Sequence, residues 1–81
     1  MTSAQKAFAA TVQDDLRRRT KMMARLQAIA SDADLVRFGV KEGVLMPEVE
    51  DLTDWPGNRA PKTVREMDEM EARLREFLKQ P

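Results

Sequence analysis

The chain has 81 residues, with 14 basic and 14 acidic side chains that cancel, and it contains no histidine, cysteine or tyrosine. Without histidine it lacks the side chain that transfers protons near neutral pH, and without cysteine it lacks a thiolate for nucleophilic attack, for zinc or for a disulfide bond. We therefore expect that the protein is not an enzyme and that it binds no metal, cofactor or small-molecule substrate.

The length predicts one small domain over residues 1–81. A chain this short buries only about 60% of its unfolded surface, so helix packing has to be regular or supported by a partner. No segment approaches the roughly 20 apolar residues of a membrane span, and no signal-peptide pattern follows the first residues. We expect a cytoplasmic protein that does not contact membranes.

The first predicted element is a long helix over residues 3–30, a segment without glycine or proline. Thr2 and Gln5 have the spacing of a capping box at its start. Arg19 lies on the apolar stripe of this helix, and we expect it to reach water or pair with Asp15, with a carboxylate of another element as the alternative. The stripe recurs at helical spacing and consists of Phe8, Val12, Leu16, Met23, Leu26 and Ala30.

Residues 32–46 allow two interpretations. Ser31 is suited to cap a helix over residues 32–42, and Gly43 is suited to end it. The alternation of apolar and polar side chains over residues 36–46 instead fits a small β-hairpin. The helix is preferred because an isolated two-stranded hairpin is only marginally stable.

Residues 47–62 are predicted to form turns and an extended linker, since three prolines interrupt them. A capping box formed by Thr63 and Glu66 then opens a helix over residues 64–79. We expect ion pairs Glu69–Arg73 and Glu71–Arg75 along this helix. Its apolar stripe consists of Val64, Met67, Met70, Leu74, Phe77 and Leu78.

The predicted fold is all-α, with the long N-terminal helix packed in a helical hairpin against the C-terminal helix and a short helical or irregular middle segment. Residues 1–30 carry six basic and two acidic side chains, whereas residues 31–58 carry two basic and seven acidic ones. The acidic middle is therefore expected to fold over the basic first helix, and the alternative is that the basic face of this helix binds an acidic partner. A 28-residue helix is about 42 Å long and the C-terminal helix about 24 Å, so the acidic middle or a partner has to cover the rest of the apolar stripe.

The function predicted from these features is a non-catalytic helical protein–protein interaction module, such as a small subunit, adaptor or inhibitor of a larger complex. Its partner is another protein or a second copy of the chain bound through the first helix. Trp55 is expected either to close the core or to anchor a partner. The candidate partner-binding residues are Phe8, Val12, Leu16, Arg17, Arg18, Lys21, Arg25 and Trp55.

The alternative function is a nucleic-acid-binding regulator that uses the basic face of the first helix, formed by Arg17, Arg18, Lys21 and Arg25. No aromatic residues alternate with these cations, so the sequence does not favour base stacking. The acidic residues of the middle segment lack the spacing of a calcium-binding loop and are interpreted as caps and surface charge.

Overall fold

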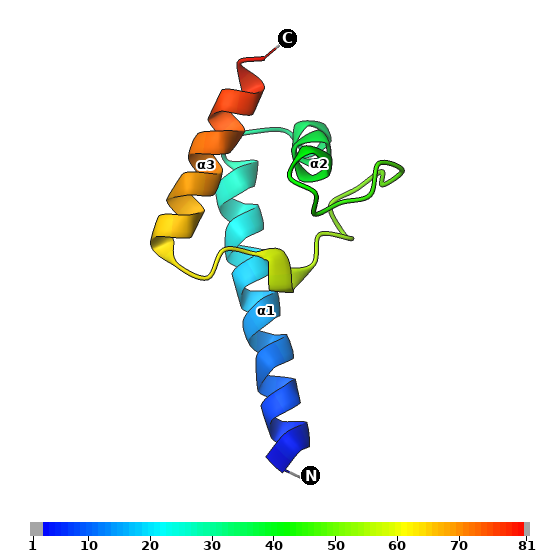
Figure 1. Cartoon of the computed structure of the whole chain (residues 1–81), viewed down its shortest axis with the longest axis vertical. Helices are drawn as coiled ribbons and strands as arrows, with labels where there is room; N and C mark the ends of the chain where they lie inside the picture. Colours follow the sequence, from blue (N-terminus) through cyan, green and yellow to red (C-terminus); the bar gives the residue numbers. More distant parts are fainter. Residues whose placement is uncertain (1–2, 81) are drawn as a thin grey trace.

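The computed structural model describes residues 3–80, apart from the side chains of Ala4, Ala7 and Phe8. It confirms the all-α prediction, and no strand occurs among the described residues. The elements are helix α1 (Ser3–Gln27), helix α2 (Asp32–Lys41), the short 3₁₀ helix η1 (Gly57–Arg59) and helix α3 (Val64–Leu78) (Figure 1).

Helix α1 ends three residues earlier than predicted, because the carbonyl of Leu26 accepts hydrogen bonds from the backbone N–H groups of both Ile29 and Ala30 at 3.0 Å. These bonds close the last turn and satisfy carbonyl groups at the helix end. The capping box predicted at Thr2 lies outside the described residues. Helix α1 is nevertheless continuous over its 25 residues, without the break that a glycine or proline introduces.

Helix α2 forms in place of the alternative hairpin over residues 36–46, which is absent from the structure. Ser31 caps α2 by accepting a hydrogen bond from the Asp34 backbone N–H at 3.3 Å. Gly43 follows the helix at φ 76°, a conformation that L side chains rarely adopt, and therefore ends it as predicted.

Helix α3 begins at the predicted capping box. The Thr63 hydroxyl accepts from the Glu66 backbone N–H at 3.1 Å, and the Glu66 carboxylate accepts from the Lys62 backbone N–H at 2.7 Å. The helix ends at Leu78, one residue before the predicted end.

The core forms where α1, α2, α3 and the middle segment meet. Helix α2 lets Trp55 approach closely because residue 39 is glycine: a Cβ there would lie 2.5 Å from Leu45 Cδ1 and 3.0 Å from Trp55 Cζ3. The most completely buried side chains are those of Trp55, Phe38, Met22, Leu26, Leu35 and Leu74. All of the α1 members lie in the C-terminal part of that helix, so the core leaves its N-terminal part uncovered.

The predicted packing of the N-terminal helix against the C-terminal helix is confirmed, and the two helices run in the same direction (Figure 1). Arg25 of α1 pairs with Asp68 at 3.0 Å and with Glu71 at 2.6 Å. Residues 42–63 carry the chain back from the end of α1 to its middle before α3 begins. Helices α1 and α3 are therefore connected by the whole middle segment and not by one tight turn.

The N-terminal half of α1 extends beyond the other elements as a single helix (Figure 1). The molecule measures 52 × 29 × 18 Å, with a radius of gyration of 14.1 Å. A compact chain of this length has a radius of gyration of about 12 Å. We call residues 3–14 of α1 the projecting arm.

Candidate interaction surface

The covered part of α1 ends where the middle segment crosses it. Gly57 of η1 lies so close to α1 that an added Cβ would be 2.5 Å from the backbone oxygen of Asp15. Arg19 donates hydrogen bonds from Nε to the Trp55 carbonyl at 2.7 Å and from Nη2 to the Leu52 carbonyl. These contacts hold residues 52–57 on α1 next to the C-terminal end of the projecting arm, which comprises residues 3–14.

Neither partner expected for Arg19 is the one observed. Asp15 pairs with Arg18 instead, and no carboxylate of another element pairs with Arg19 among the described residues. The reason is that the loop presents two backbone carbonyls to the guanidinium, whose planar set of N–H donors suits two acceptors. The sequence shows that Arg19 lies on the apolar stripe, but no sequence pattern indicates that backbone carbonyls of a distant loop accept its hydrogen bonds.

The projecting arm exposes every side chain that the structure describes in it. On the stripe, Val12 keeps 40% of its surface accessible and Leu16, one turn further on, keeps 57%. Phe8 belongs to α1, but its side chain lies outside the described part of the structure. Two large aliphatic side chains thus lie one helical turn apart at the point where α1 leaves the core.

Most of the basic face of α1 is already paired with carboxylates. Arg18 pairs with Asp15, and Arg25 pairs with two carboxylates of α3. The hydrogen bond to Glu71, and then that to Asp68, raise the pKa of Arg25 above its ordinary value. Arg17 lies 3.9 Å from Asp14, and Lys21 makes no ion pair among the described residues.

Trp55 lies in the core and exposes none of its surface. Its indole Nε1 is buried without a hydrogen-bond partner in the described structure. The buried position matches the core interpretation of Trp55. Its side chain is not accessible to a partner in this conformation, so we leave Trp55 out of the candidate surface.

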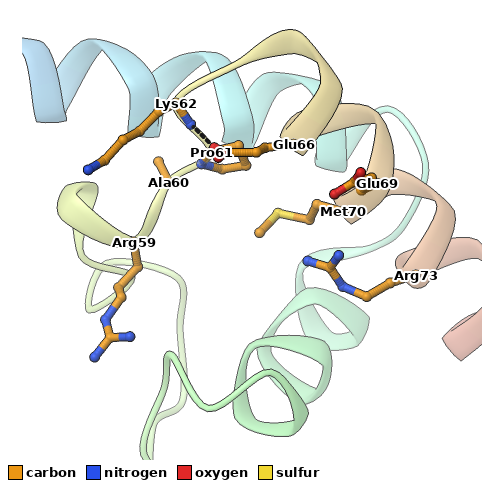
Figure 2. A pocket seen from close by; sticks show the side chains of 8 residues that line it. All are labelled: Arg59, Ala60, Pro61, Lys62, Glu66, Glu69, Met70 and Arg73. Carbon is orange, nitrogen blue, oxygen red and sulfur yellow. Dashed lines mark hydrogen bonds between the residues drawn. The ribbon is translucent and has the colours of Figure 1, made fainter.

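A shallow hollow of about 340 Å³ lies between the linker and α3 (Figure 2). Glu69 and Arg73 face it, but Glu69 pairs with Arg65 at 3.2 Å and Arg73 with Glu42 at 2.8 Å. Arg59 points away from the carboxylates (Figure 2). The two carboxylates of this hollow, Glu69 and Glu66, are therefore engaged in an ion pair and in backbone capping.

The described residues contain no group of three or more acidic side chains arranged to hold a metal ion. Among the same residues, no helix combines the length and the apolar character needed to cross a membrane. No family model matches the chain, and neither a curated protein nor a solved structure shows significant similarity to it.

Proposed function

We propose that the protein is a non-catalytic helical interaction module that binds a larger protein through the projecting arm of α1 and the adjoining turn that carries Leu16. It would serve as a small subunit, adaptor or inhibitor. The observation that carries the proposal is the exposure of Val12 and Leu16 on a continuous helix that leaves its own core. A cytoplasmic setting is part of the proposal and agrees with the absence of cysteine.

The geometry of the arm supports this role. Apolar side chains separated by one turn are the anchors with which an amphipathic helix enters a groove of a partner. A pre-formed helix loses less conformational entropy on binding than a segment that folds at the partner surface. The absence of histidine and cysteine, together with the engaged carboxylates of the hollow, makes a binding role a better fit than catalysis.

The test places a photo-crosslinking amino acid at position 12 of the full chain in the native host. We expect a discrete crosslinked partner that disappears when Leu16→Glu is introduced into the same chain. A crosslinker at Ala72, an exposed position of α3, serves as the control and is expected not to capture this partner. A folded Leu16→Glu variant that still crosslinks from position 12 would contradict the proposal.

The alternative function, binding of nucleic acid by the basic face of α1, has less support. Arg18 and Arg25 are paired with carboxylates, which leaves Lys21 and the weakly paired Arg17 for phosphate groups. Binding through these cations would weaken steeply as the salt concentration rises. The absence of a mobility shift with duplex or single-stranded nucleic acid at low salt would remove this alternative.

A further inference from the structure

A second surface lies on the covered half of α1, at its contact with the start of α3. A groove of about 220 Å³ lies there, and no carboxylate side chain lines it. Its apolar lining includes Met67 and Val64, and Val64 is 73% exposed. Its cations are Arg18, Lys21, Arg25 and Lys62. We call this surface the basic groove.

Two of the four cations carry charge that the chain itself does not neutralise. The side chains of Lys21 and Lys62 are exposed and make no ion pair among the described residues. Arg18 also lines the groove, but its guanidinium pairs with Asp15, and its Nε atom is buried without a hydrogen-bond partner among the described residues. The basic groove therefore combines exposed apolar surface with positive charge available for an anionic group.

The chain also carries a segment with the complementary properties. No basic residue occurs from Glu42 to Asn58. Within this stretch we call residues 46–54 the acidic segment. Its side chains are exposed except those of Val49, which is half-buried, and Leu52, which is buried in the core, and it begins with Met46, which is 63% exposed. Glu48, Glu50 and Asp54 make no hydrogen bond or ion pair among the described residues. The acidic segment thus offers carboxylates next to an exposed apolar side chain.

We propose that the acidic segment of one copy of the chain docks into the basic groove of a second copy. The carboxylates of Glu48 and Glu50 would face Lys21 and Lys62, and Met46 would contact Val64. This association goes beyond the proposed function, since it uses neither Val12 nor Leu16.

The fold explains why the segment does not occupy the groove of its own chain. The acidic segment and the start of α3 lie on opposite sides of α1 (Figure 1). The hydrogen bonds from Arg19 to the carbonyls of Leu52 and Trp55 hold the segment on its side. A second copy, in contrast, can bring its segment to the groove without rearrangement of either fold.

The basic groove and the acidic segment lie on different faces of the molecule, so the contact is head-to-tail. Such a contact produces an open-ended series of copies or a closed ring. A loop in a groove buries less than the 1,200 Å² or so of a stable interface, which predicts weak association. A nucleic acid would fit the basic groove less well, because its phosphate groups gain nothing from contact with the exposed side chain of Val64.

Sedimentation velocity of the full chain across a wide concentration range tests the proposal. We expect self-association at low salt that weakens about tenfold or more at high salt, where exposed ion pairs are screened. A segment variant carries Glu48→Gln, Glu50→Gln and Asp54→Asn, and a groove variant carries Lys21→Gln and Lys62→Gln. Each variant alone is expected to remain monomeric, with an unchanged circular dichroism spectrum because these side chains are exposed.

Mixing the two variants gives the decisive outcome. The segment variant keeps an intact groove and the groove variant keeps an intact segment, so the mixture is expected to form a dimer and nothing larger. A wild-type chain that stays monomeric at every concentration and salt would overturn the proposal. So would association that persists in both variants but disappears with Leu16→Glu, or binding of an oligonucleotide in the groove without self-association.

Discussion

The Nε atom of Arg19 lies 2.7 Å from the backbone carbonyl oxygen of Trp55, and this contact joins the middle of α1 to the segment that closes the core. The same guanidinium donates to the carbonyl of Leu52. Arg19, a cation on the apolar stripe, thereby fixes a loop. Its N–H groups donate to the Trp55 carbonyl and to the Leu52 carbonyl, which also accepts from the Trp55 backbone N–H at 3.1 Å.

Replacing Arg19 by methionine keeps most of the side-chain volume and removes both hydrogen bonds. We expect the free energy of unfolding to fall by about 1–3 kcal/mol, since the carbonyls of Leu52 and Trp55 lose a charged donor. The fluorescence of Trp55, the one tryptophan of the chain, reports any loosening of the loop. Urea unfolding of Arg19→Met beside the exposed control Arg17→Met measures the effect, and equal stabilities would contradict this account.

Substitution of Gly57 by alanine is expected to destabilise the fold by about 1–3 kcal/mol, because the new methyl group would overlap the backbone of α1. The overlap is with the backbone oxygen of Asp15, at 2.5 Å, and a backbone atom cannot turn away as a side chain can. The neighbouring change Asn58→Ala is the control, since Asn58 is exposed. A stability equal to that of the control would show that η1 packs less closely on α1 than described.

Two leucines of α1 should respond very differently to truncation. Leu26 is 0% exposed, and Leu26→Ala is expected to cost about 2–5 kcal/mol. Leu16 is 57% exposed, and Leu16→Ala is expected to change stability by no more than about 0.5 kcal/mol. Thermal and urea unfolding of both variants test this difference. A large loss in Leu16→Ala would mean that Leu16 is covered by the chain itself.

The pKa of Asp34 at the start of α2 is lowered, first by the hydrogen bond from Arg37 and then by that from the Ser31 hydroxyl. A pKa that is lower in the folded than in the unfolded chain stabilises the fold above the unfolded value of about 3.9. That contribution is lost as the pH falls through the folded pKa. An NMR titration of the carboxyl group is expected to find the Asp34 pKa closer to its ordinary value in Arg37→Met, and an identical titration in both proteins would contradict the assignment.

The three α-helices could be predicted from the amino-acid sequence because their signals are local. Capping residues such as Thr63 act within one turn, Gly43 ends α2 through its own backbone conformation, and apolar spacing marks the face that each helix buries. The all-α class follows from these signals, and helix length predicts that α3 alone is too short to cover the apolar stripe of α1. The α-helix ends differ from expectation by up to three residues, because the final turns tighten through alternative hydrogen bonds.

Ion pairs between different elements could not be predicted from the sequence, because they depend on how the helices pack. Glu69 was expected to pair with Arg73, and Glu71 with Arg75, along α3. Instead Glu71 pairs with Arg25 of α1, Arg73 pairs with Glu42 just after α2, and Glu69 pairs with Arg65. The side chains of Glu71 and Arg73 are long enough to reach either a neighbour on α3 or a residue of another element. The packing of α3 beside α1 determines which of these partners they meet. The same packing buried Trp55, placed Lys62 beside Lys21 and left Val12 and Leu16 exposed, since these outcomes depend on contacts between segments that are far apart in the chain.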